Sequence, residues 1–261
     1  MAVGERAPAV AIWQDVEFGA YTGDLPLWAA LAAAASGPVL EIGAGSGRVA
    51  LRLARSGHDV IAVESDEVLA RELMRRWREG RRPEWGSAFA VTSGDIGAPE
   101  GSPSGEPGSI SPRLAIAPLH VIQQLPPLRR ASALRNLGRM LPPGGRAALV
   151  VVDEASFLYE DDPALEPRTP DMREVDGWVY ASEPLWLQVD EKTIRVRRLR
   201  KRVSPDGEIE RSVHDELLHR LTPDELEDEA RAADLRPVAR RAIASEGGEA
   251  DSLAVILEVP A

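Results

Sequence analysis

The 261-residue sequence contains no cysteine, which excludes disulfide bonds, thiolate metal ligands and cysteine nucleophiles. Aromatic residues make up only 5% of the chain, although 44% apolar residues are enough for a globular core. Basic residues are outnumbered by acidic ones, 31 to 42, so the formal net charge is −11. Such a surface repels nucleic acids and anionic membranes. We therefore expect a cytoplasmic protein with neither a nucleic-acid nor a membrane partner.

A hydrophobic run long enough to cross a membrane is also missing. Residues 25–35 are apolar, but they follow Asp24 instead of a basic segment and contain Pro26. A spanning helix needs about 20 apolar residues, and a signal peptide begins with a positively charged region. The segment is therefore interpreted as a helix of a soluble protein.

The most informative segment is residues 38–48, Pro-Val-Leu-Glu-Ile-Gly-Ala-Gly-Ser-Gly-Arg, which combines an apolar strand with a glycine-rich turn. Glycine lacks a Cβ atom, so the backbone can turn sharply and approach a ligand closely. A second apolar strand, residues 60–64, ends at Glu64, where a carboxylate can accept hydrogen bonds from the two hydroxyls of a ribose. This order is typical of the first βαβ unit of a nucleotide-binding sheet.

The glycine spacing separates two kinds of nucleotide site. A dinucleotide site has the pattern Gly-x-Gly-x-x-Gly, whereas this segment has Gly-x-Gly-x-Gly followed by Arg48. Glu41, two residues before the first glycine, suits a ligand with ammonium and sulfonium groups better than one with two phosphates. The segment resembles motif I, (Asp/Glu)-x-Gly-x-Gly-x-Gly, of the class I S-adenosylmethionine-dependent methyltransferases. A nicotinamide-dependent dehydrogenase is the less favoured alternative.

The rest of the chain fits the same class. Residues 141–145, Leu-Pro-Pro-Gly-Gly, precede a strongly apolar strand, as in these methyltransferases. The resemblance implies an α/β fold with a Rossmann-like seven-stranded doubly wound sheet, and an antiparallel extension inserted after strand five. The predicted units are an N-terminal segment with a lid helix (1–37), the S-adenosylmethionine-binding core (38–152), the extension as substrate lid or dimer surface (153–220), and a helix with a closing hairpin (221–261).

Within these units, residues 1–12 are expected to form a loose tail. We expect three strands in the extension, over residues 178–189, 193–203 and 208–218, and a helix over about residues 131–141.

The resemblance also implies a cofactor site for S-adenosylmethionine, with S-adenosylhomocysteine as product. The glycine turn should surround the methionine end and Glu64 should bind the ribose. Asp95 should accept a hydrogen bond from the adenine amino group, although a turn-capping role is the alternative. The predicted cofactor residues are Glu41, Gly43, Ala44, Gly45, Gly47, Glu64, Ser65, Asp95, Ile96 and Ala117.

Two candidate catalytic residues have equally plausible structural roles. His120 follows the fourth strand and is either a general base or a polar wall of the acceptor pocket. Tyr21 either belongs to a lid over the cofactor or packs the N-terminal helix on the sheet. Residues 117–120 lack the Asn/Asp-Pro-Pro-(Tyr/Phe) pattern of enzymes that methylate DNA amino groups or glutamine amides. No metal site is predicted, because Asp153 and Glu154 have no recognisable partner ligands.

The strongly basic segment, residues 195–202, either holds an anionic substrate or RNA, or pairs with acids such as Glu208 and Glu210. The net charge favours pairing. The favoured function is methyl transfer to nitrogen or oxygen of a small molecule. The alternatives are a methyltransferase acting on RNA or protein, and a cofactor-binding protein without catalysis; a homodimer is possible. The acceptor is not identified by the sequence.

Overall fold

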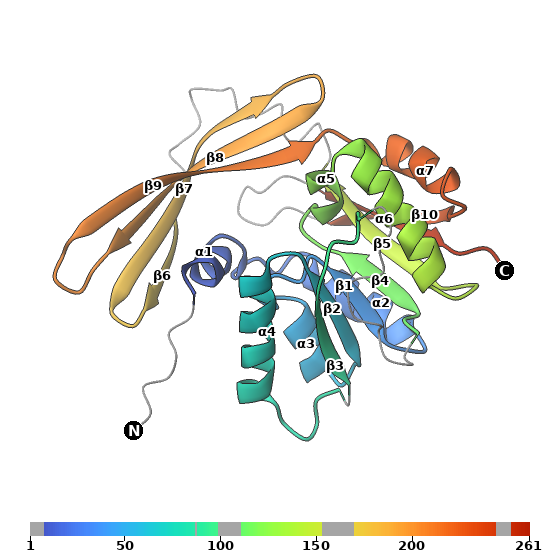
Figure 1. Ribbon diagram of the computed structural model, residues 1–261, viewed down its shortest axis with the longest axis horizontal. Helices are drawn as coiled ribbons and strands as arrows, with labels where there is room; N and C mark the ends of the chain where they lie inside the picture. Colours follow the sequence, from blue (N-terminus) through green and yellow to red (C-terminus); the bar gives the residue numbers. More distant parts are fainter. Residues whose placement is uncertain (1–7, 87, 99–110, 153–169, 244–251) are drawn as a thin grey trace.

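The computed structural model describes residues 8–86, 88–98, 111–152, 170–243 and 252–261. A seven-stranded sheet forms its centre, in the order β3-β2-β1-β4-β5-β11-β10 (Figure 1). The first five strands of the chain pair in parallel, and β11 runs antiparallel to both β5 and β10. The strands are β1 (Val39–Ile42), β2 (Val60–Glu64), β3 (Phe89–Ser93), β4 (Leu114–Ala117), β5 (Arg146–Val152), β10 (Arg236–Ile243) and β11 (Ser252–Glu258).

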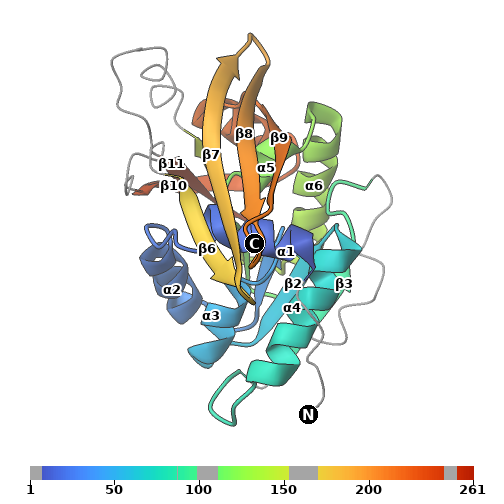
Figure 2. The same cartoon turned by 90° about the vertical axis from the view of Figure 1, so that its left-hand side faces the viewer.

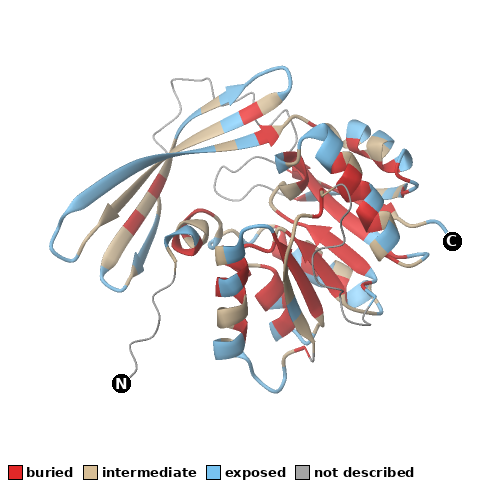
Figure 3. Ribbon diagram, in the orientation of Figure 1, coloured by how far each residue is buried: buried red, intermediate tan, exposed pale blue. Residues whose placement is uncertain are grey.

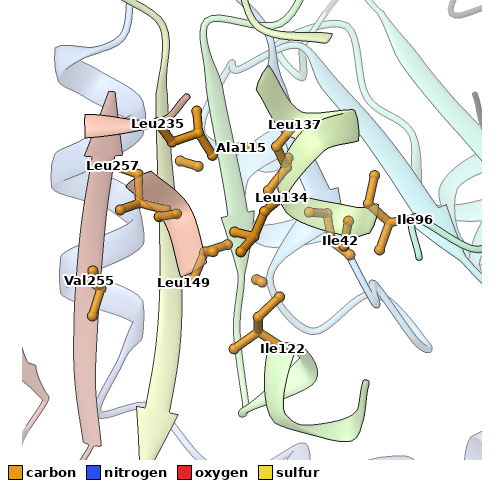
Figure 4. Close-up of a cluster of buried hydrophobic side chains, with 14 of the residues drawn as sticks. Ile42, Ile96, Ala115, Ile122, Leu134, Leu137, Leu149, Leu235, Val255 and Leu257 are labelled. Carbon is orange, nitrogen blue, oxygen red and sulfur yellow. The ribbon is translucent and has the colours of Figure 1, made fainter. Parts of the chain in front are cut away.

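Helices cover both faces of this sheet, which is why its central strands are almost continuously apolar. On one face, α2 (Leu25–Ala34), α3 (Ala50–Arg55) and α4 (Glu67–Gly80) share a buried cluster with the strands. On the other, α5 (Val121–Gln124), α6 (Pro127–Met140) and α7 (Pro223–Arg231) pack through a second cluster, drawn in Figure 4. Burial is concentrated in this sandwich (Figure 3).

A second, four-stranded antiparallel sheet lies beside the carboxyl ends of the central strands (Figures 1 and 2). This inserted sheet consists of β6 (Asp171–Val175), β7 (Trp178–Val189), β8 (Thr193–Val203) and β9 (Ile209–His219). Helix α1 (Ala9–Phe18) lies between it and the core. The predicted fold is thus confirmed, including the insertion after strand five and the closing hairpin.

Three sequence predictions need correction. Residues 9–12 are not a loose tail but the first turn of α1, whose Ile12 and Val16 are buried against Tyr180 of the inserted sheet. The inserted sheet has β6 in addition to the three predicted strands. Helix α6 begins at Pro127, earlier than expected, because proline is well suited to the first helical turn.

The basic segment, residues 195–202, is largely paired within the chain, as the net charge favoured. Five of its cations form ion pairs with carboxylates. Of the two predicted partners, Glu210 forms such a pair, whereas no ion pair of this segment in the described residues involves Glu208. The pairs are Arg197–Asp215, Arg198–Asp171, Arg200–Glu17, Lys201–Glu183 and Arg202–Glu210.

Among the described residues, no helix is long and apolar enough to span a membrane, and no cluster of three candidate metal ligands occurs. Asp153 and Glu154 lie outside the described residues.

Candidate cofactor and acceptor site

A cavity of about 260 Å³ opens at the carboxyl ends of β1, β2 and β3, where ligands bind in open α/β sheets. The core supplies most of its wall, but α1 and β9 contribute as well. Its lining residues are Gln14, Phe18, Ile42, Gly43, Val63, Glu64, Ser65, Leu69, Gly94, Asp95, Ile96, Leu119, Val121, Gln124, Leu125 and Glu216. Seven of the ten predicted cofactor residues line this cavity or a smaller one beside it, namely Glu41, Gly43, Ala44, Glu64, Ser65, Asp95 and Ile96.

The glycine turn connects β1 to α3 in a conformation that other residues adopt only with strain. The φ angles of Gly43, Gly45 and Gly47 are +67°, +56° and +99°. A Cβ atom on Gly43 would lie 2.6 Å from a methyl carbon of Val121, so a side chain there would displace Val121, which also lines the cavity. Glycine at this position therefore lets the turn pack against that wall.

Glu64 lies at the end of β2 with its side chain turned toward the glycine turn. Its carboxylate accepts hydrogen bonds from the backbone N–H of Gly45 at 2.7 Å and of Asp66 at 2.9 Å. The residue is only 7% exposed, yet it lines the cavity. It thus presents carboxylate oxygens where the resemblance places the ribose hydroxyls.

Asp95 and Ile96 follow β3 and form the next part of the wall. The Asp95 carboxylate forms an ion pair with Arg129 and accepts a hydrogen bond from the Gly97 N–H at 2.8 Å. The turn-capping role is thus present, together with a place in the cavity lining. Ile96 is buried and presents an apolar surface beside it.

Glu41 is buried beneath the turn, and its Oε2 atom has no hydrogen-bond partner in the described structure. Burial raises the pKa of its carboxyl to about 8, while the nearby Arg48 acts in the opposite direction. Arg48 does not neutralise Glu41 fully, because its guanidinium forms a bidentate pair with Asp24 at 2.6 and 2.5 Å. Glu41 also lines a smaller cavity of about 40 Å³ beside the turn. A buried carboxyl group with one unpartnered oxygen therefore faces the region expected to hold the methionine end of the cofactor.

Helix α1 lies across the glycine turn. The sequence predicts a lid helix within residues 1–37, but not a helix that begins at Ala9. The Gln14 side-chain oxygen accepts a hydrogen bond from the Ser46 N–H at 2.6 Å, and Gln14 lines both cavities. Asp15 accepts a hydrogen bond from the Ser46 hydroxyl at 2.7 Å and pairs with Arg76 of α4. The helix thus covers the glycine turn and borders both cavities.

The same helix is anchored to the inserted sheet through Glu17, which accepts hydrogen bonds from Arg200 and Ser182, each at 2.7 Å. Burial opposes ionisation of Glu17, but the hydrogen bonds and charges of Arg200, Ser182 and Arg198 outweigh it and lower the pKa. No short motif marks Gln14 or Glu17, and only their tertiary contacts identify them.

The candidate catalytic residues lie outside the lining of both cavities. His120 Nε2 is 2.8 Å from the Ser252 hydroxyl oxygen, and burial lowers the pKa of the imidazole to about 4. At pH 7 the ring is neutral, as a base must be, but such a base is weak. The guanidinium carbon of Arg48 lies over the Tyr21 ring, 5.3 Å from the ring centroid. That contact agrees with the packing alternative for Tyr21.

The segment after β4 nevertheless reaches the cavity through other residues. Ala117 is buried within the sheet, whereas Pro118 and Leu119 line the cavities. Leu119 and His120 both have positive φ angles, +50° and +60°, which is strained for residues with side chains. Such strain is common where a loop shapes a functional site.

No protein-family model and no curated protein matches the sequence. Solved structures do match. The CcbJ methyltransferase from Streptomyces caelestis has a TM-score of 0.66 at 22% identity, over 92% of this chain and 97% of that one. CalS10, an amino pentose methyltransferase from Micromonospora echinaspora, has a TM-score of 0.64 at 14% identity, over 94% and 96%. The sugar N-methyltransferase KedS8 from a Streptoalloteichus species has a TM-score of 0.67 at 14% identity, over 98% of both chains.

The chain therefore has the fold of these methyltransferases. The resemblance drawn from residues 38–48 is confirmed at the level of the fold, and the inserted sheet is included in the likeness because nearly the whole chain is covered.

Proposed function

We propose that the protein is an S-adenosylmethionine-dependent methyltransferase acting on nitrogen or oxygen of a small molecule. The observation that carries this proposal is the convergence of the glycine turn, Glu64 and Asp95 on one cavity, in the methyltransferase fold. Each of the three comes from a different β-strand end, so their convergence is a property of the fold and not of one short motif.

The residues present fit this cofactor. Gly43 lines the cavity without a side chain, Glu64 offers carboxylate oxygens for the ribose, and Ile96 offers an apolar surface for the adenine. Glu41 provides an unpartnered buried oxygen near the methionine end. S-Adenosylmethionine supplies a methyl group on a sulfonium, from which an acceptor can take it by in-line displacement.

The protein's own contribution is then to orient the acceptor and exclude water, which account for much of the rate in such a transfer. Helix α1 covers the glycine turn and the inserted sheet reaches the cavity with Glu216, so both can enclose an acceptor. We assign residues 153–220 this lid role. Neighbours described as acting on an amino pentose and on a sugar nitrogen favour nitrogen over oxygen.

The proposal includes a cytoplasmic location and the absence of a nucleic-acid partner, which rest on composition alone. A homodimer through the inserted sheet is supported by the exposed apolar residues Met172, Val213 and Leu217. His120 and Tyr21 remain candidates for the catalytic step.

Transfer from methyl-labelled S-adenosylmethionine tests the proposal. The label should enter amino sugars, or sugars that carry hydroxyl groups alone, in a small-molecule panel. Glu64→Gln should reduce that incorporation. Label found only in added RNA or protein would favour the macromolecular alternative. Cofactor binding without transfer to any fraction would favour a protein without catalysis.

A further inference from the structure

One carboxylate in the cavity is not explained by the cofactor. Of the three lining acids, Glu64 accepts hydrogen bonds from two backbone N–H groups, and Asp95 is paired with Arg129. The third, Glu216, comes from β9 of the inserted sheet. Within the described residues its side chain has one hydrogen-bond partner, the Gln124 amide nitrogen of α5, at 3.0 Å.

The register of the inserted sheet explains why Glu216 faces the cavity. Glu216 pairs with Val196 of β8, and Leu218, two residues along on the same face, is buried together with Ile194. Residues of the opposite face, such as Leu217, are exposed. The alternation of a β-strand therefore turns Glu216 toward the core and not toward solvent.

Two other acids of the same strand form ion pairs, whereas Glu216 forms none among the residues that the structure describes. Asp215 is paired with Arg197 on the outer face, and Glu210 is paired with Arg202. A carboxylate that has a neutral amide as its only partner retains its negative charge and at least one oxygen able to accept further hydrogen bonds.

Gln124 adds a second acceptor to this position. An ionised carboxylate can only accept, so the Gln124 NH₂ group must face Glu216, and its side-chain oxygen is left for another donor. Two acceptors with one negative charge complement a ligand group that carries several N–H donors and a positive charge. A protonated amine has both properties.

We propose that Glu216, oriented by Gln124, recognises the acceptor by binding a positively charged amino group. This inference rests on the proposed function, and makes Glu216 a specificity-determining residue supplied by the inserted sheet. The amino group held in this way fixes the position of the acceptor in the cavity. Methyl transfer occurs at another atom of the acceptor, or at this nitrogen after it has lost its proton to solvent.

The test compares three amino sugars with their neutral counterparts. Glucosamine, galactosamine and mannosamine, and the N-acetyl derivative of each, are titrated by ligand-observed NMR against the protein saturated with S-adenosylhomocysteine. The wild-type protein should prefer the amines, and Glu216→Gln should weaken amine binding about tenfold or more, as for loss of a charge-assisted hydrogen bond. Glu216→Asp, which keeps the charge, should retain part of the preference.

Glu208→Gln is the matched control, because Glu208 is an exposed acid in the turn before β9. It should leave the preference unchanged, and all variants should bind S-adenosylhomocysteine as the wild type does, which excludes misfolding. Equal binding of amines and N-acetyl derivatives by the wild type, or an unchanged preference in Glu216→Gln, would overturn the inference.

The two proposals can fail separately. With an amine acceptor, Glu216→Gln should raise KM for the acceptor and leave KM for the cofactor unchanged; an unchanged acceptor KM would overturn the inference and leave methyl transfer established. An amine that binds through Glu216 but is never methylated would instead contradict the proposed function.

Discussion

The sharpest physical prediction concerns Glu41, whose carboxyl is fully buried beneath the glycine turn. Its pKa is raised by burial to about 8 in the folded protein, against an ordinary value of 4.5. The nearby Arg48 lowers this pKa only in part, because its guanidinium is paired with Asp24. The carboxylate of Glu64 raises the pKa of Glu41 further. Between these two pKa values, the folded chain holds a proton on Glu41 that the unfolded chain releases.

The sign of the pH dependence follows from this difference in bound protons. Because the folded state binds more protons here, the free energy of unfolding falls as pH rises, by about 1.4 kcal/mol per pH unit from this group alone. The contribution is fully present below pH 4.5 and is lost by about pH 8. Glu41→Gln replaces the acid by a neutral group of similar shape and removes this dependence.

The assay is urea unfolding of the wild type and Glu41→Gln at pH 5.5 and 7.5. The stability of the wild type relative to the variant should fall by roughly 3 kcal/mol between the two pH values. Glu67→Gln, an exposed acid at the start of α4, should show almost no such change relative to the wild type. A constant difference between wild type and Glu41→Gln would show that Glu41 is ionised in the folded protein, and would refute the reasoning.

Three further predictions concern stability, each measured by urea unfolding. Thr222→Ala removes the capping box of α7 with Glu225 and should cost about 1 kcal/mol; an unchanged unfolding midpoint would contradict the role of the cap. Leu134→Ala empties part of the fully buried cluster under α6 and should cost about 2–5 kcal/mol, whereas a cost below 1 kcal/mol would mean that the core closes around the cavity. Gly47→Ala places a Cβ atom against Leu73 at a φ of +99° and should cost about 1–3 kcal/mol; a neutral or stabilising effect would show that the turn relaxes without strain.

The core of the fold could be predicted because local signals and fold agree there. Residues 38–48 combine an apolar strand with glycines at positions that require positive φ angles, and Glu64 ends a strand of purely apolar residues. The Pro-Asp-Gly turn predicted the hairpin of β8 and β9 in the inserted sheet. In each case a few adjacent residues carry the information.

The remaining features depend on contacts between distant residues. Glu17 and Arg200 are 183 positions apart. Arg200 belongs to the basic segment 195–202, but nothing in the sequence indicates Glu17 as its partner. Strand β6, Asp-Met-Arg-Glu-Val, is too polar to be recognised as a strand, because it lies at the sheet edge with much of its length exposed. Glu216 resembles any solvated acid of an alternating strand until the register places it in the cavity.

Calorimetric titration with S-adenosylmethionine tests the central claim most directly, with NAD as the competing ligand and Glu64→Ala and Glu67→Ala as matched variants. The account predicts micromolar binding of S-adenosylmethionine, weakened roughly a hundredfold, or about 2.7 kcal/mol, by Glu64→Ala and unchanged by Glu67→Ala. Binding of NAD but not S-adenosylmethionine, or equal affinities in wild type and Glu64→Ala, would contradict it.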